Sequence, residues 1–286
     1  MKYSEFSDPC LVAIYDTVNP IAEYRAFYIE LAAKLAGARQ VSSIVDIGCG
    51  SGQLTCELAK QGHHLIGVEP SSAMLNLARR RTATDLVAAE LTAADIGTVE
   101  WIHGGAQSLG AFDADLAVMT GHVAQFFLED EIWHGALASI YKALKPGGYL
   151  VFESRNPIVQ PFLMASRQTA VQESDQGSDR ESDHVDWPSE TNRRRVIDPV
   201  AGAVEWWFQL LSVEGDRVLY EIHYLFEKTG EKAISTNELR FRTRGELEAN
   251  LVAAGFTVEC VYGNWDFQLA EAGSPEFIFV AKAAEF

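Results

Sequence analysis

The chain has 286 residues, of which 48% are hydrophobic and 22% are charged, and its formal net charge is −17. This composition is typical of a folded globular protein rather than a disordered one. A surface of this sign repels a nucleic-acid backbone, so we expect no nucleic-acid partner and a small-molecule substrate.

The sequence also lacks the signals of membrane, secreted and metal-binding proteins. No apolar stretch approaches the roughly 18 residues that span a bilayer, and the N-terminus has no signal-peptide pattern. The four cysteines are too sparse for a disulfide framework. His, Cys and carboxylate residues form no local metal-ligand pattern. We therefore expect a cytoplasmic protein with reduced thiols and no metal ion.

The first half of the chain alternates short apolar runs with helix-like segments, which is typical of a parallel sheet covered by helices. The expected strands are residues 43–47, 64–68, 99–103, 115–119 and 149–153. The expected helices are residues 52–61, 71–81 and 129–144, with a further helical connection at 82–97. The low polar content of the strands indicates burial on both faces.

The second half of the chain changes pattern twice. Residues 166–189 are polar and aperiodic, which predicts a surface loop or lid. Alternating residues within 194–242, with turns at 215–216 and 229–231, predict an antiparallel β-meander. A helix at 244–254 and strands at 257–261 and 276–281 then return to the first pattern, which brings the expected core strands to seven.

A glycine loop follows the first strand. Asp46 ends that strand, and Gly48, Gly50 and Gly52 then occupy alternate positions before the first helix. Such a turn lets the backbone approach a ligand closely, although a tight turn without a ligand is the alternative. A dinucleotide site would place its third glycine at Gln53, so the spacing disfavours NAD, and no Gly-Lys-Ser/Thr of a P-loop follows.

Glu69 ends the second strand, about 20 residues after the first glycine of the loop. A carboxylate there can accept hydrogen bonds from both hydroxyls of a ribose. Both NAD and S-adenosylmethionine contain such a ribose. Glu69 therefore indicates an adenosine cofactor without choosing between the two.

The glycine loop, residues 66–71, residues 112–125 and the sequence Leu-Lys-Pro-Gly-Gly at 144–148 together resemble the motifs of class I S-adenosylmethionine-dependent methyltransferases of the small-molecule type. The resemblance covers roughly residues 13–156, with a weaker match after 244. It implies an α/β fold: a Rossmann-like, doubly wound seven-stranded sheet whose last strand is antiparallel, with the β-meander as an insertion.

The same resemblance implies a division of the chain and a set of cofactor residues. Residues 1–156 would form an N-terminal cap and the S-adenosylmethionine-binding core, 157–243 a lid loop and the β insertion, and 244–286 the completion of the core. The expected cofactor-binding residues are Tyr15, Tyr28, Asp46, Gly48, Gly50, Gly52, Glu69, Pro70, Gly105, Ala106, Met119 and Thr120.

Two of these assignments carry their own alternatives. Gly105 stands where the family has an adenine-binding aspartate, so either the backbone N–H of Ala106 or another group must hold the adenine. Tyr15 is expected to bind the methionine carboxylate, with simple packing under the cap as the alternative.

The candidate catalytic and substrate-binding residues follow the fourth and fifth strands. His122 is the candidate base because an imidazole can accept a proton near neutral pH, and holding its loop is the alternative role. Arg155 and Asn156 are candidates for binding a polar or anionic substrate, while Arg155 could instead pair with a lid carboxylate. Aromatic residues of the meander are candidates for the roof of the site or for its core.

The sequence favours methyl transfer to a small molecule and leaves two other functions open. One is a catalytically silent S-adenosylmethionine-binding protein, which the missing carboxylate at Gly105 supports. The other is an NAD-dependent oxidoreductase, which Gln53 opposes. The sequence allows a homodimer and does not specify whether oxygen, nitrogen or carbon is methylated.

Overall fold

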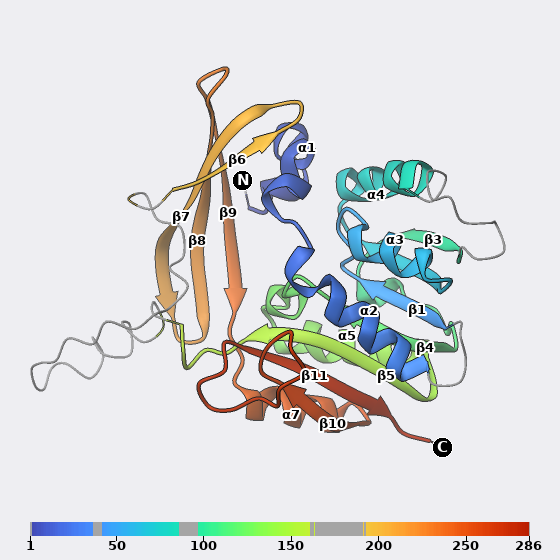
Figure 1. The fold of residues 1–286 in the computed structure, drawn as a ribbon. Helices are drawn as coiled ribbons and strands as arrows, with labels where there is room; N and C mark the ends of the chain where they lie inside the picture. Colours follow the sequence, from blue (N-terminus) through green and yellow to red (C-terminus); the bar gives the residue numbers. More distant parts are fainter. Residues whose placement is uncertain are drawn as a thin grey trace, which may run out of the picture.

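A computed structural model describes residues 2–36, 42–85, 97–160, 163, 191 and 193–285. They form a seven-stranded sheet covered by helices and a separate four-stranded sheet (Figure 1). The expected lid at 166–189 and most of the expected connection at 82–97 lie outside these residues. Among the described residues, no helix is long and apolar enough to cross a membrane.

The large sheet has the strand order β3-β2-β1-β4-β5-β11-β10. Its strands are β1 (Ser43–Ile47), β2 (His64–Glu69), β3 (Val99–His103), β4 (Ala114–Met119), β5 (Leu144–Arg155), β10 (Phe256–Tyr262) and β11 (Glu276–Ala283). The last strand, β11, lies between β5 and β10 and is antiparallel to both. The predicted Rossmann-like seven-stranded sheet with an antiparallel last strand is therefore confirmed.

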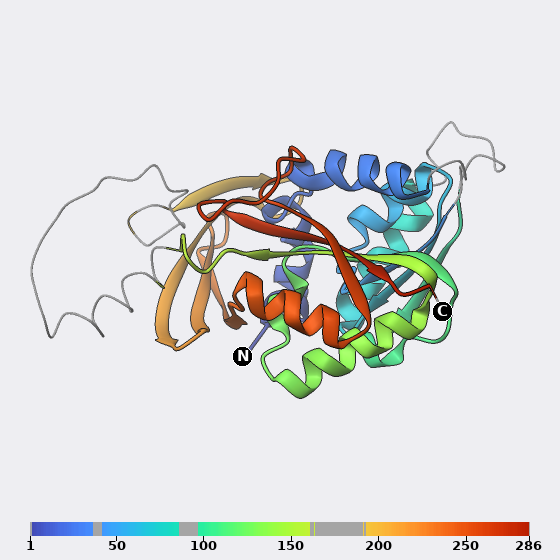
Figure 2. The ribbon, with the colours of Figure 1, turned by 90° about the horizontal axis from the view of Figure 1, so that it is seen from below.

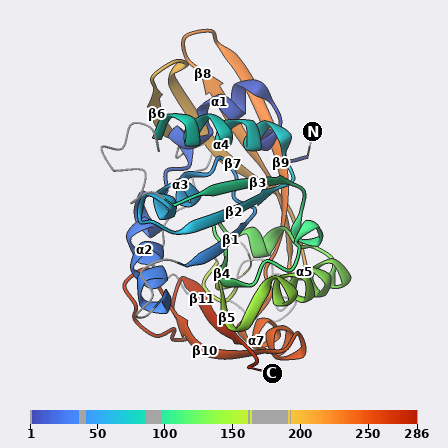
Figure 3. The ribbon, with the colours of Figure 1, turned by 90° about the vertical axis from the view of Figure 1, so that its right-hand side faces the viewer.

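Helices cover both faces of the large sheet, as Figures 2 and 3 show. The helices α2 (Ala22–Ala36) and α3 (Gln53–Lys60) pack on one face, and α5 (Asp130–Ala143) and α7 (Arg244–Ala253) pack on the other. Successive strand residues alternate between the two cores: Ile44 and Leu65 face α2 and α3, while Val45 and Val68 face the opposite side. Burial on both faces explains the nearly continuous apolar strands.

Two boundaries differ from the sequence prediction by more than two residues. The helix α4 (Ser72–Asp85) extends past the expected end at residue 81. Strand β5 begins at Leu144, although its Pro-Gly-Gly was expected to form a turn before the strand. Leu144 already pairs with Ala114, the register then shifts, and Gly147 takes a φ of 73° at the irregularity. The turn is thus contained within the strand.

The small sheet is the predicted antiparallel meander, β6 (Arg194–Asp198), β7 (Gly202–Glu214), β8 (Arg217–Phe226) and β9 (Glu231–Arg240). One face packs on α1 (Pro9–Val18), where Leu11 and Ile14 contact Trp206 and Tyr224. The N-terminal residues pair with β9, since Tyr3 N–H donates to the carbonyl of Thr236 at 2.9 Å. Helix α1 consequently lies between the two sheets (Figure 1).

Substitution of Gly67 on β2 tests how tightly the large sheet packs against the side chain of Trp101 on β3. A Cβ at Gly67 would lie 2.3 Å from the indole ring of Trp101, and that ring also covers Gly52. We expect Gly67→Ala to lower the free energy of unfolding by about 1–3 kcal/mol, because overpacking forces neighbours to move. Urea unfolding measures this.

Gly135→Ala in the middle of α5 is the matched control, because nothing lies within 4 Å of a Cβ there. It should leave stability unchanged or raise it by up to about 1 kcal/mol. Equal midpoints for the two variants would contradict the packing described for Trp101.

Candidate functional site

A cavity of about 1360 Å³ opens at the carboxyl ends of β1, β2, β4 and β5. Helix α1 and the small sheet form its opposite wall. Its lining includes residues of the glycine loop, Glu69, Pro70, Gly105, Ala106, Thr120, His122 and Arg155. The structure therefore brings most of the predicted site residues to one cavity, at the edge where open α/β sheets bind ligands.

The glycine loop turns sharply because three of its residues adopt the left-handed region. Gly48, Gly50 and Gly52 have φ values of 70°, 55° and 74°. Gly48 and Gly50 line the cavity, whereas Gly52 starts α3 behind them. A Cβ at Gly48 would lie 2.7 Å from the side chain of Val123, so the loop also needs glycine to pack closely against the segment that follows β4.

Glu69 holds the loop from the neighbouring strand. Its carboxylate accepts hydrogen bonds from the backbone N–H of Gly50 at 3.1 Å and of Ser71 at 2.7 Å. Burial raises the pKa of Glu69 above its ordinary value, and the two backbone donors oppose that rise. Glu69 therefore sits between loop and cavity as a desolvated carboxylate.

Asp46 lies beneath the loop and does not line the cavity. The hydroxyl of Thr55 donates to its Oδ2 at 2.6 Å, and its Oδ1 is buried without a hydrogen-bond partner. Burial raises the pKa of Asp46 to about 7. An unpaired buried acceptor of this kind costs stability.

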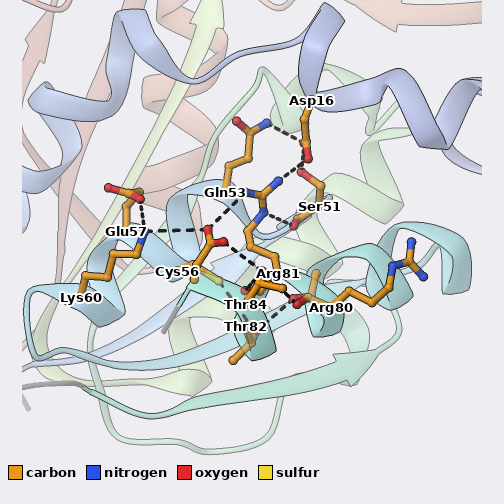
Figure 4. A network of polar contacts seen from close by, with 12 residues as sticks. Asp16, Ser51, Gln53, Cys56, Glu57, Lys60, Arg80, Arg81, Thr82 and Thr84 are labelled. Carbon is orange, nitrogen blue, oxygen red and sulfur yellow. Dashed lines mark hydrogen bonds and ion pairs between the residues drawn. The ribbon is translucent and has the colours of Figure 1, made fainter. Parts of the chain in front are cut away.

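Asp16 ties the N-terminal cap to the glycine loop (Figure 4). Its carboxylate accepts from the hydroxyl of Ser51 and from the amide of Gln53 at 2.9 Å, and it pairs with the guanidinium of Arg81. Arg81 also donates to the carbonyl of Ser51 at 3.0 Å. Helix α1, the loop and α4 therefore share one ion-paired junction. The Gln53 side chain, which marked the departure from a dinucleotide motif, is part of it.

Three tyrosines of the cap region differ in position. Tyr15 lines the cavity, and so does Tyr24, which the sequence analysis did not select. Tyr28 does not line it: its ring is buried, and its hydroxyl donates to the carboxylate of Glu153. Burial and the neighbouring Glu153 raise the pKa of Tyr28 well above its ordinary value.

The expected adenine side is built by the short helix η2 (Ala106–Ser108) after β3. Gly105, Ala106 and Gln107 all line the cavity. The amide of Gln107 is the neutral polar group nearest to Gly105, where the sequence lacked a carboxylate. Sequence reasoning had left the identity of this group open.

His122 is fixed at three points beside β4. Its φ is 61°, a left-handed value that is unusual outside glycine. Its backbone N–H donates to Oε1 of Glu153 at 2.9 Å, and its Nε2 lies 3.0 Å from both carboxylate oxygens of Glu276. Glu276 begins β11 and pairs with Arg155 across the strands. Only the pairing of β11 with β5 brings it here, so no local sequence signal marked it.

The other candidates on this edge divide between the cavity and the core. Thr120 and Arg155 line the cavity, and Arg155 donates to the side-chain carbonyl of Gln125 at 3.0 Å. Met119 is buried in the core. Asn156 is fully buried and donates to the carbonyls of Ala272 at 3.0 Å and Ser274 at 2.8 Å. Asn156 therefore holds the loop that leads into β11.

The small sheet supplies part of the cavity wall. Trp206, Phe208 and Arg194 line the cavity, whereas Trp207 stacks on His223 at a ring distance of 5.1 Å. Arg240 and Arg242, at the end of β9 and just after it, pair with Asp130. In the described part of the chain, no group of three His, Cys, Asp or Glu residues could hold a metal ion.

Comparison with known proteins gives a consistent result. Residues 44–148 match the family described as "Methyltransferase domain". The ubiquinone biosynthesis O-methyltransferase of Paraburkholderia phytofirmans is 32% identical over 150 residues, which are 52% of this chain and 56% of that protein. The 18S rRNA (guanine-N(7))-methyltransferase of Arabidopsis thaliana is 27% identical over 198 residues, 66% and 64% of the two chains. The chain thus spans about half to two thirds of the length of these relatives.

Two solved structures share the fold over nearly the whole chain. An S-adenosylmethionine-dependent methyltransferase from Clostridium acetobutylicum has a TM-score of 0.70 and 14% identity, with 95% of this chain and 96% of the other covered. The amino pentose methyltransferase CalS10 from Micromonospora echinaspora, solved with its methyl donor, has a TM-score of 0.61 and 20% identity, with 95% of each chain covered.

Arg81→Met tests the junction at Asp16. The substitution removes the guanidinium and keeps an apolar stem, so α1 loses its ion pair with α4 and is held to the loop only by the hydrogen bonds of Asp16 with Ser51 and Gln53. We expect the backbone amides of α1 to exchange hydrogen about tenfold faster, since a hydrogen bond to a charged group contributes about 1.5–3 kcal/mol and this one is partly exposed. Hydrogen-exchange mass spectrometry measures the rate.

Arg80→Met is the control for that experiment, because the Arg80 side chain points away from the junction (Figure 4). It should leave exchange in α1 unchanged. The same acceleration in both variants would show that the junction does not hold the cap.

Asp46→Asn tests the buried carboxyl through pH. The pKa of Asp46 rises from 3.8 to about 7 in the folded chain, so the folded state binds the extra proton between these values and wild-type stability falls as pH rises through them. The asparagine variant lacks this loss. Its stability relative to wild type should grow with pH and reach a gain of about 1–4 kcal/mol at about pH 8.

Urea unfolding without added ligand at about pH 4.5 and about pH 8 measures the difference, and the low-pH pair is its internal control. A difference between the two chains that is the same at both pH values would contradict the assignment.

Proposed function

Because the chain belongs to the class I S-adenosylmethionine-dependent methyltransferases, we propose that it transfers a methyl group to a small molecule held in the cavity described above. The observation that carries this proposal is the cavity itself. Its 1360 Å³ exceeds the roughly 300–1,000 Å³ of a site for a single small ligand, and it runs from the glycine loop to His122. It thus has space for a cofactor and an acceptor together.

S-adenosylmethionine supplies an electrophilic methyl group on a sulfonium. The residues around the loop suit such a group: the three positive-φ glycines leave the backbone open, and Glu69 faces the cavity as a ribose acceptor. We propose that Tyr15 and Thr120 contact the methionine part. The backbone N–H of Ala106, with the amide of Gln107, would bind the adenine.

In this proposal, the expected cofactor residues that do not line the cavity stabilise the residues that do. Asp46 lies under the loop, Met119 belongs to the core, and the hydroxyl of Tyr28 donates to Glu153. Asn156 shapes the β11 edge instead of binding substrate. The domain boundaries, the cytoplasmic location and the homodimer stay predictions.

A small acceptor fits the walls better than a nucleic acid does. The cavity lies between two sheets, and the chain carries a net charge of −17, so a phosphate backbone would meet repulsion outside it. Catalysis is favoured over silent binding because the cavity contains an oriented imidazole, that of His122, and is also lined by Thr120 and Arg155. We propose His122 as the catalytic base.

Glu69→Gln tests the cofactor end of the cavity. The amide keeps the shape but replaces one oxygen acceptor with a donor, so it should disturb both the ribose and the backbone of the loop. We expect affinity for S-adenosylhomocysteine to fall about tenfold or more, as loss of a charged hydrogen bond costs about 1.5–3 kcal/mol. Isothermal titration calorimetry measures this affinity.

Glu100→Gln on the exposed face of β3 is the matched control and should bind as wild type does. Unchanged affinity in Glu69→Gln would remove Glu69 from the proposed site.

A further inference from the structure

Two carboxylates hold His122, one at its backbone and one at its imidazole ring. Glu153 accepts from its backbone N–H at 2.9 Å and fixes the left-handed backbone, while Glu276 binds the ring at Nε2. Burial raises the pKa of Glu153, and the hydroxyl of Tyr28 stabilises its ionised form. A strained residue with two such supports is typical of a functional position.

The second ring nitrogen of His122 is available to a ligand. Nδ1 has no hydrogen-bond partner among the described residues, and it is not among their buried unpaired atoms. Since His122 lines the cavity, Nδ1 is reachable there. With the Nε2 proton directed at Glu276, Nδ1 carries the lone pair, which is the arrangement of an oriented general base.

Cationic side chains line the same cavity as this base. Arg155 and Arg194 both line the cavity, and the carboxylate of Glu276, which also lines it, is engaged by His122 through both oxygens. An acceptor that arrives as an ammonium ion would meet two guanidinium groups. A neutral hydroxyl that develops negative charge would be stabilised by them.

Aromatic rings form a continuous wall next to the base. Phe126 contacts Tyr3 at a ring distance of 5.7 Å and Phe6 at 5.8 Å, and Phe6 contacts Tyr15 at 5.9 Å. All four rings line the cavity, and Phe208 of the small sheet also does. Such a wall suits a flat, unsaturated ring.

From these observations we infer that the acceptor atom is the oxygen of a hydroxyl group on an aromatic or conjugated ring, and that Glu276 is the residue that positions His122 to deprotonate it. The inference rests on the proposed methyl transfer. It goes further by naming the acceptor chemistry and a positioning residue that no local motif marks.

The step balances without any further reactant. The hydroxyl oxygen forms a bond to the methyl carbon as the bond between that carbon and the sulfonium sulfur breaks, and the electron pair of the broken bond stays on sulfur. The hydroxyl proton passes to Nδ1 of His122, and Glu276 stabilises the resulting imidazolium. The proton then leaves to solvent, so the base is regenerated.

An amine acceptor would need this arrangement less. A neutral amine attacks with a free lone pair and can lose its proton after transfer, whereas a hydroxyl is a weak nucleophile until its proton leaves. An O–H acceptor therefore accounts for the oriented, half-buried pair of His122 and Glu276.

Binding of 4-nitrophenol tests the inference without turnover. The probe is titrated into the chain with S-adenosylhomocysteine, buffered below the pH at which the free probe ionises, and the visible band of bound nitrophenolate is recorded. We expect wild type to ionise the bound probe. Glu276→Gln should reduce the ionised fraction about tenfold, as should His122→Asn.

The matched probe 4-nitroaniline separates positioning from structural damage. Its affinity should be the same in wild type and Glu276→Gln, because it gives no proton to His122. Glu259→Gln, an exposed substitution on β10, should behave as wild type with both probes.

Three other outcomes would each overturn a different part of this inference. A nitrophenol that fails to bind, or that binds un-ionised to wild type, overturns the hydroxyl-acceptor inference. Equal weakening of both probes in Glu276→Gln overturns the positioning role. Binding of S-adenosylhomocysteine is measured by calorimetry for wild type and every variant. If wild type does not bind it, the proposed function itself is refuted. If wild type binds it, a failed nitrophenol experiment overturns only the inference about the acceptor.

Discussion

The turn from β1 into α3 must pass through three residues with positive φ, and the rest of the site is arranged around that requirement. Such a turn cannot hold itself, since glycine gives it freedom rather than rigidity. Glu69 fixes it from β2 through the N–H of Gly50, and Asp16 fixes it from α1 through Ser51 and Gln53. One loop therefore joins the parallel sheet to the cap, and through the cap to the small sheet.

Four of the buried carboxyl groups have raised pKa values. Burial is the main cause of the raised pKa of Glu5, Asp46, Glu69 and Glu153, and for Glu5 the value is about 7. Glu5 lies where the N-terminal residues meet β9, and it accepts from Asn237 at 3.2 Å. Desolvated acids of this kind reduce stability. Of the four, Glu69 lines the cavity, where a bound ligand can offset that cost.

The strands, the glycine loop and the meander could be predicted because each depends on local pattern: apolar runs, alternate glycines, or alternating residues. The antiparallel direction of β11 was predicted from the resemblance to the methyltransferase family. Which side of a strand or helix faces a cavity depends on packing instead. Tyr28 and Tyr24 lie one helical turn apart, yet only Tyr24 lines the cavity. Glu276 reaches His122 only through the pairing of β11 with β5, across a sequence separation of 154 residues. No spacing rule could have indicated that contact.

The central claim is that the glycine loop and Glu69 form an adenosine site for a methyl donor and not for a dinucleotide. The side chain of Gln53 donates to Asp16 and to the carbonyl of Asn19 at 3.0 Å, at the position where a dinucleotide motif has its third glycine. Titration calorimetry of wild type with S-adenosylmethionine, S-adenosylhomocysteine and NADH tests this claim most directly. The account predicts one-to-one binding of the two adenosyl ligands and none of NADH; binding of NADH alone would contradict it.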